Sequence, residues 1–294
     1  MAAIAAPTAS RGAEGGLTNY LAGYFGDFAV AVTPQPGLVT YSTAYYYRAK
    51  TEGPKIPDTI SLDGIIQING FQFVTRHKLF GAQLAFGGYT TLLQADLSAA
   101  VPTGAGTTFI EADANGFGDS SISPLILYWS HGNLYVNLYE NIIIPTGRYS
   151  TSRILNTGRN YFSFDTVLAL TWLDLKRGLE LSLVPGVMIN TKNSRTDYKT
   201  GAEFHLDGMA NLFLSPEFAI GLHTYAYAQI EDDTGAGAIA SGLRSSSAGI
   251  GPSVLWLPKR LGIDGKIVGK WLHEYHARNR FKGDIVSLTI ALRF

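Results

Sequence analysis

Apolar and polar residues alternate in a series of short stretches along the chain, and clusters of Gly, Asn, Asp or Pro separate these stretches. The stretches are residues 38–48, 60–73, 82–93, 120–129, 134–144, 162–172, 179–189, 203–214, 218–230, 246–256, 266–275 and 285–294. An alternation with a period of two places successive side chains on opposite faces of an extended strand. The sequence therefore predicts an all-β protein of about twelve strands.

The connections between these stretches differ in length. Short connections are RHKLFG, SHGN, LDLKRG, LSPEF and LPKRLG, whereas Gly-rich polar connections surround residues 96–116, 145–160, 190–201 and 231–243. Short and long connections alternate, so one end of the structure carries short turns and the other carries long loops. This pattern is typical of a transmembrane antiparallel β-barrel with short periplasmic turns and long extracellular loops.

The last ten residues, IVSLTIALRF, alternate up to the final Phe294. In a closed barrel this last strand pairs both with the strand before it and with the first strand at residues 38–48. Closure matters because unpaired backbone groups in lipid cost several kcal/mol each. We therefore expect the barrel to span residues 38–294.

Three tryptophans, Trp129, Trp172 and Trp256, come just before short connections, and Phe294 lies at the same end. Aromatic residues gather at the membrane interfaces of outer-membrane barrels. The four side chains are thus predicted to form an interface girdle. A large soluble β protein with core tryptophans is the alternative, but it does not readily explain why they collect at one end.

Composition narrows the function classes. Charged residues make up 16% of the chain, below the approximately 25% of ordinary globular domains, and the formal net charge is zero. The neutral charge argues against a nucleic-acid partner. Cysteine is absent, which excludes disulfides, thiolate catalysis and cysteine-bound zinc. No apolar run approaches the length of a membrane-spanning helix.

Residues 1–37 differ from the rest. Tyr20, Tyr24, Phe25 and Phe28 are loosely spaced like one face of a short helix, and the prolines of TPQPG then interrupt the chain. This segment is too apolar for a free tail and too short for a domain. We expect it to be periplasmic or to plug the lumen, because a barrel of about twelve strands is wider than its own side chains fill.

The stretch EFHLD places three ionisable side chains on one strand face and two apolar ones on the other. The apolar pair should face lipid and the ionisable group the lumen. A hydrogen-bonded network is favoured here over a zinc site. By the same alternation the predicted channel-lining residues are Asp165, Glu180, Met188, Asn190, Glu203, His205, Asp207, Tyr225, Tyr227, Gln229, Lys270, Glu274 and Arg293.

Glu140 breaks the pattern, because it falls among the lipid-facing positions of residues 134–144. A carboxylate facing lipid is unfavourable. A bulge that turns Glu140 inward is the slightly favoured explanation. The alternative is a lateral opening of the wall at Glu140, through which a hydrophobic solute enters the membrane.

Two further motifs are weak. The DTG of residues 232–237 resembles half of an aspartic protease site, but no second copy is present. Residues 111–119, EADANGFGD, resemble the start of a calcium loop, yet Ile122 stands where the bidentate Glu belongs. Both are interpreted as loops. No catalytic residue, metal site or cofactor is predicted.

Several segments together resemble the proteobacterial outer-membrane channel family labelled "meta-pathway of phenol degradation". They are residues 36–49, NGFGD at 115–119, residues 144–165, EFHLD at 203–207, residues 225–237 and HARNRFKGD at 276–284. The resemblance implies a monomeric twelve-stranded channel in the bacterial outer membrane that takes up small hydrophobic or aromatic molecules.

Two other functions remain as alternatives. An outer-membrane lipid-modifying hydrolase needs a nucleophile, a base and an orienting group at one depth. His223 and His273 are candidate bases, but alternation supplies no serine partner. A structural barrel without transport is the other alternative. The expected partners are outer-membrane lipids and small apolar solutes.

Overall fold

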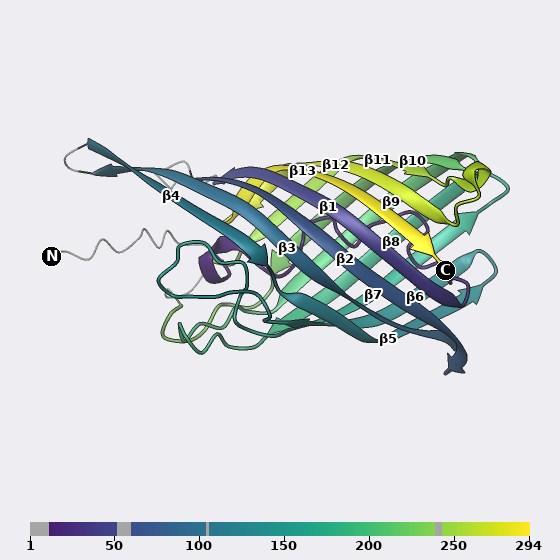
Figure 1. The fold of residues 1–294 in the computed structure, drawn as a ribbon, viewed down its shortest axis with the longest axis horizontal. Coiled ribbons are helices and arrows are strands. Elements are labelled where there is room, and N and C mark those ends of the chain that lie inside the picture. Colours follow the sequence, from purple (N-terminus) through teal and green to yellow (C-terminus); the bar gives the residue numbers. More distant parts are fainter. Residues whose placement is uncertain (1–11, 52–59, 104–105, 239–242) are drawn as a thin grey trace.

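The computed structural model describes residues 12–51, 60–103, 106–238 and 243–294. These residues form a single thirteen-stranded antiparallel sheet that closes into a barrel (Figure 1). The strands are β1 (Gly37–Thr51), β2 (Ile60–Leu79), β3 (Ala82–Thr103), β4 (Gly106–Phe117), β5 (Ser120–His131), β6 (Leu134–Ile144), β7 (Ser163–Asp174), β8 (Leu179–Asn190), β9 (Glu203–Ser215), β10 (Phe218–Gln229), β11 (Ser246–Trp256), β12 (Gly265–Arg278) and β13 (Phe281–Arg293). Two 3-10 turns, η1 (Glu14–Gly16) and η2 (Lys259–Leu261), complete the described elements.

The barrel closes between its first and last strands. β13 pairs with β12 on one side and with β1 on the other. At the chain end, Leu38 and Phe294 exchange backbone hydrogen bonds of 3.2 and 2.8 Å. The prediction that the final strand joins its predecessor to the first strand is confirmed.

β4 and β5 share one place in the wall. β4 pairs with β3 from Leu92 to Thr103, whereas β5 pairs with the opposite half of β3, from Gln83 to Tyr89. Only Gly118 and Asp119 separate the two strands. The thirteen strands therefore fill twelve places around the barrel, and the predicted twelve-stranded all-β barrel is confirmed.

The sequence predicts a long loop around residues 96–116, and this prediction is wrong. β3 continues to Thr103, and β4 returns beside it as a hairpin that projects at the end with the long loops (Figure 1). The calcium-like residues 111–117 lie in β4, in an extended conformation instead of a loop. Small and acidic residues made this stretch resemble a loop, but its regular pairing with β3 supplies the backbone hydrogen bonds.

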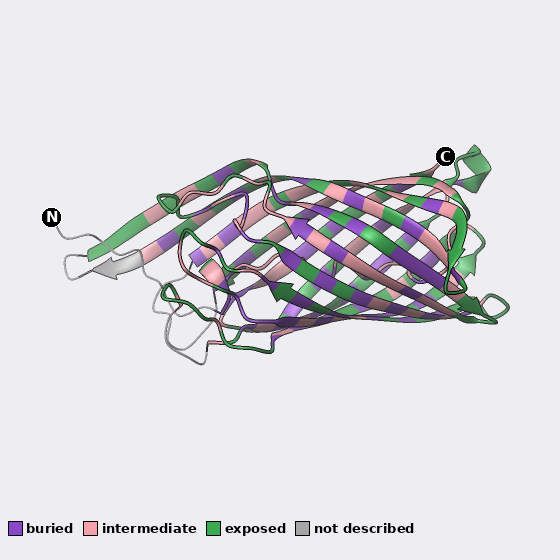
Figure 2. Ribbon diagram, turned by 90° about the horizontal axis from the view of Figure 1, so that it is seen from below, coloured by how far each residue is buried: buried purple, intermediate pink, exposed green. Residues whose placement is uncertain are grey.

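Buried and exposed residues alternate along most strands (Figure 2). In β8, Leu181, Leu183 and Ile189 are each more than half exposed, and the residues between them are mostly buried. Exposed apolar side chains on the outer face are what a barrel wall needs where it contacts lipid. The described part of the chain contains no helix long and apolar enough to cross a membrane.

The predicted girdle residues lie on the outer face near the short turns. Trp129, Trp172 and Trp256 lie near the ends of β5, β7 and β11, and Phe294 follows β13. Phe294 is 74% exposed and Trp256 is 42% exposed. Their role as an interface girdle stays a prediction.

Candidate functional site in the barrel lumen

Residues 12–36 run through the inside of the barrel from the long-loop end to the short-turn end (Figure 1). We call them the inner segment; residues 1–11 of the predicted N-terminal segment lie outside the described residues. At the long-loop end, the Glu14 carboxylate accepts hydrogen bonds from Asn193 at 2.9 Å, Thr196 at 2.6 Å and Tyr149 at 3.1 Å. These donors come from two loops, so the inner segment ties the loops together.

Asp207 of β9 holds the middle of the inner segment. Its side chain is fully buried and accepts hydrogen bonds from the Tyr20 hydroxyl at 3.3 Å and the Gly26 amide at 3.2 Å. His223 Nε2 of β10 lies 3.0 Å from the same carboxylate. Buried charges are tolerated when donors surround them. Asp207 therefore joins two wall strands to two points of the inner segment, Tyr20 and Gly26.

His205 of β9 forms a second buried pair. Its Nε2 lies 2.9 Å from Asp165 Oδ1 on β7. The imidazole ring stacks against both Tyr20 and Phe25, with ring centroids 4.7 Å apart in each case. The aromatic residues of the inner segment thus cover the ionisable groups of the wall.

Residues 23–29 of the inner segment contact one acidic and one basic side chain of the wall. Glu180 of β8 accepts a 2.8 Å hydrogen bond from the Ala29 amide. Lys270 of β12 donates to the carbonyls of Gly23 at 2.8 Å and Gly26 at 2.7 Å. These contacts use backbone groups of the inner segment, which need partners once water is excluded.

Two tyrosines of β10 complete this network. Tyr225 donates to Glu274, and Tyr227 donates to Glu203, which also accepts a 2.9 Å hydrogen bond from Asn190. Tyr227 stacks on Tyr20 with ring centroids 5.3 Å apart. Both hydroxyls and one ring face of Tyr227 are therefore already in contact with other groups.

The structure brings most of the predicted lining residues together on the inner wall of β7–β10 and β12, where they are buried among one another and the inner segment. Eleven have relative exposures of 4% or less: Asp165, Glu180, Met188, Asn190, Glu203, His205, Asp207, Tyr225, Tyr227, Gln229 and Glu274. Lys270 borders an open cavity. Arg293 lies at the short-turn rim, where its Nε donates to Asp264 at 2.7 Å. A channel-lining role for the whole set stays a prediction.

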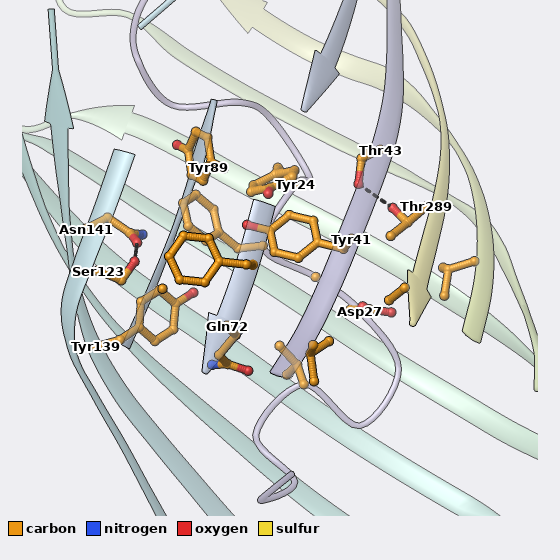
Figure 3. A pocket seen from close by; sticks show the side chains of 18 of the residues that line it. Tyr24, Asp27, Tyr41, Thr43, Gln72, Tyr89, Ser123, Tyr139, Asn141 and Thr289 are labelled. Atoms are coloured by element: carbon orange, nitrogen blue, oxygen red, sulfur yellow. Dashed lines mark hydrogen bonds between the residues drawn. The ribbon is translucent and has the colours of Figure 1, made fainter. Parts of the chain in front are cut away.

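The open cavity lies on the other side of the lumen, between the inner segment and a wall that includes β1, β2, β3, β5 and β6 (Figure 3). Its volume is about 270 Å³. Many aromatic rings line it: Tyr24, Phe25, Tyr41, Tyr45, Phe71, Tyr89, Tyr128 and Tyr139. The sequence interpretation missed the five wall tyrosines. Each of them lies at an inward position of its strand, so alternation could have identified them; the predicted set consisted mostly of ionisable residues.

Polar groups beside this cavity are bonded to each other. Thr43 and Thr289 have their hydroxyl oxygens 2.8 Å apart, and Ser123 donates to Asn141 at 2.6 Å (Figure 3). Lys266 pairs with Asp27 at the edge of the cavity. The cavity wall therefore offers aromatic faces between polar groups that already have partners.

Glu140 points outward. β6 pairs with β7 in unbroken register, and Glu140 accepts a 2.5 Å hydrogen bond from Thr166 of β7. The favoured interpretation that a bulge turns Glu140 inward is therefore wrong. The irregularity lies across the pair, in β5 between Ile122 and Leu125. Pro124 in that stretch lacks the backbone N–H that a regular ladder needs.

The loops above the lumen carry their own ion pair. Lys192 donates to Asp197 at 2.6 Å, and this ammonium group lowers the pKa of the Asp197 carboxyl from its ordinary value. Asp197 also accepts a 3.0 Å hydrogen bond from the Ala236 amide. The described residues contain no group of three metal-binding side chains placed to hold an ion.

The family model described as "Putative MetA-pathway of phenol degradation" matches residues 48–290. The chain belongs to this family. Membership confirms the family resemblance drawn from the sequence. No curated protein sequence matches the chain.

Solved structures with a similar fold are bacterial outer-membrane barrels. The COG4313 outer membrane channel from Pseudomonas putida F1 is similar with a TM-score of 0.72 and 17% identity, over 91% of this chain and 99% of that one. The β domain of the Bordetella autotransporter BrkA gives a TM-score of 0.48 and 11% identity, over 88% of this chain and 100% of that one. The first likeness confirms the outer-membrane barrel fold of this family member.

Proposed function

We propose that the protein is an outer-membrane diffusion channel for the uptake of small hydrophobic or aromatic molecules. The observation that carries this proposal is the aromatic cavity of about 270 Å³ inside the barrel. Tyrosine rings provide apolar contact area, and their hydroxyls keep the polar edge of the site satisfied. The family description and the similar Pseudomonas channel support the same function.

The bonding of the cavity wall favours apolar solutes. An apolar ring that lies beside the Thr43–Thr289 pair displaces no protein hydrogen bond, because the two hydroxyls bond to each other. A sugar-like solute would have to compete for such partners. The outer leaflet obstructs small apolar molecules even though their transfer into hydrocarbon is favourable, so a sheltered route benefits them.

The inner segment acts as a plug in this proposal. Its contacts with Asp207, Glu180 and Lys270 hold it against one side of the lumen and leave the aromatic cavity as the remaining space. The alternative periplasmic placement of residues 1–37 does not agree with these contacts for residues 12–36. The domain division into this segment and a barrel of residues 38–294 is part of the proposal.

Exit can be lateral. Glu140 faces outward beside the irregular stretch of β5, and Ser123 in that stretch also lines the aromatic cavity. An interrupted ladder has fewer hydrogen bonds between the two strands at that point. We keep Glu140 as the position that marks a lateral opening, with lipid as the receiving phase.

No covalent chemistry is part of this function. Of the candidate bases for a hydrolase, His223 is buried against Asp207, and His273 lies outside, 3.1 Å from Asp284. Neither has a serine hydroxyl among its hydrogen-bond partners in the described residues. We propose a monomer, because the single barrel encloses the whole site.

A filling substitution tests the proposed route. Thr43→Trp places a large ring in the aromatic cavity, whereas Ala44→Trp places the same ring on the outer face of the same strand. We expect Thr43→Trp to slow the initial uptake of radiolabelled toluene several-fold in cells that lack other copies of the channel, and Ala44→Trp to leave it unchanged. Heat-dependent migration on gels checks that both variants fold. Equal uptake by both folded variants contradicts the route.

A further inference from the structure

A second cavity, of about 120 Å³, lies at the long-loop end of the lumen. The inner segment, β1, β2, β3 and the loop after β6 surround it, and its walls combine aliphatic side chains with the rings of Tyr20, Tyr45 and Tyr47. Leu21, Leu62, Ile66, Leu93 and Leu155 contribute to the lining. An engineered apolar cavity of about 150 Å³ binds benzene, so a single aromatic ring is the size of body that suits this space.

The cationic side chain of Arg280 lies among these apolar groups. Arg280, in the tight turn between β12 and β13, lines the cavity and is only 8% exposed. Its guanidinium lies 4.4 Å from the centre of the Tyr227 ring. Among the described residues, Nε and Nη1 of Arg280 have no hydrogen-bond partner. Buried donors without partners are rare and unfavourable, which points to an absent acceptor.

The nearby carboxylates do not supply that acceptor. Glu203 and Glu274 lie close enough to attract Arg280. However, Glu203 accepts from Tyr227 and Asn190. Glu274 accepts from Tyr225, from Tyr47 and from the Gly283 amide. The two carboxylates therefore neutralise the site from a distance and leave guanidinium N–H groups free for a further acceptor.

A second guanidinium, that of Arg159, also lines this cavity, from the loop between β6 and β7. The loop is fixed at that point, because Asp119 accepts a 2.8 Å hydrogen bond from the Arg159 amide. The cavity therefore combines an aliphatic body with cationic groups on its lining. This combination matches an amphipathic anion better than a neutral hydrocarbon.

We propose that this cavity binds a small aromatic monocarboxylate, with its ring against the leucines and its carboxylate accepting hydrogen bonds from Arg280. The proposal rests on the proposed uptake function and names a solute class for the same lumen. The site lies at the long-loop end, so it is the first site that a solute from outside meets. Neutral aromatics lack the negatively charged acceptor that pairs best with a buried guanidinium.

Binding of benzoate to the purified full chain in detergent tests the proposal, with benzyl alcohol as the neutral ligand of the same ring. We expect isothermal titration to detect benzoate, and to show at least tenfold weaker binding of benzyl alcohol. Arg280→Gln should weaken benzoate binding at least tenfold. Arg278→Gln is the matched control, because Arg278 lies two residues away and is exposed; it should leave the affinity unchanged.

Equal binding of benzoate and benzyl alcohol to the unaltered protein overturns the proposal, and this comparison needs no variant. Equal benzoate affinity of the Arg280→Gln variant overturns it as well. If that variant does not fold, Arg280→Lys keeps the charge but not the planar donor group, and should bind benzoate more weakly. If the protein takes up toluene but does not bind benzoate, this proposal fails while the proposed uptake function is retained.

Discussion

The two sides of the lumen are built differently, although both follow the same alternation of inward and outward residues. The side of β7–β10 and β12 carries buried charges, and the inner segment covers it through bonds to Asp207 and Glu180. The side of β1–β3, β5 and β6 carries Tyr41, Tyr89 and Tyr139 around open space. An inward position is thus not the same as a channel-lining position.

The two sides differ in how many hydrogen-bond partners they provide for the backbone of the inner segment. A segment whose only regular element is one 3-10 turn has many backbone amides and carbonyls that need partners in a dry lumen. Carboxylates and ammonium groups provide such partners, and tyrosine-rich walls provide fewer. The segment therefore docks on the charged side and leaves the aromatic side free for a solute.

Deletion of residues 1–36 should have the largest effect on this contrast. Loss of the inner segment uncovers the charged wall and opens the whole lumen, so single-channel conductance in planar bilayers should rise several-fold. The unaltered protein, recorded in the same bilayers, is the reference. An unchanged conductance in a deletion variant that still shows heat-dependent migration would contradict the plug.

Asp207→Ala should have an intermediate effect. Removal of this carboxylate leaves the Gly26 amide, the Tyr20 hydroxyl and His223 without their shared acceptor. A buried donor left without its acceptor costs about 1–3 kcal/mol. We expect frequent transient openings in conductance records. Asp284→Ala is the control, because its partner His273 is exposed and such surface pairs contribute at most about 1 kcal/mol. Identical records for the two variants would show that the charged side does not hold the segment.

Lys270→Met should have the smallest effect. Lys270 contacts the inner segment and also borders the aromatic cavity, so it lies at the boundary of the two sides. Loss of its charge should shift the reversal potential in a salt gradient toward cation preference, with little change in conductance. Lys50→Met, on the exposed face of β1, should leave the reversal potential unchanged. A larger shift for Lys50 than for Lys270 would place the ion path outside this cavity.

The sequence alone could predict the barrel, because lipid and lumen impose opposite preferences on alternate residues of every strand. The same rule identified Asp165, Glu203 and His205 as inward. It did not separate β4 from a loop, because small residues such as those of 111–117 suit both states. It also placed Glu140 among the outward positions, where the structure has it; the bulge expected to turn Glu140 inward was wrong, since the irregularity lies in the partner strand β5.

The twelve places in the wall, the facing of most strands and closure at Phe294 were thus determined by the sequence itself, through a local pattern with a period of two. Only the tertiary structure decided which inward residues are covered and which line open space. That outcome depends on contacts between segments far apart in the chain, such as Tyr20 with Asp207 or Leu21 with Arg280 around one cavity. Alternation with a period of two shows which face of a strand a residue is on, but it does not show which segment packs against that face. The lumen is therefore divided by where the inner segment finds hydrogen-bond partners, and this is a property of the closed barrel as a whole.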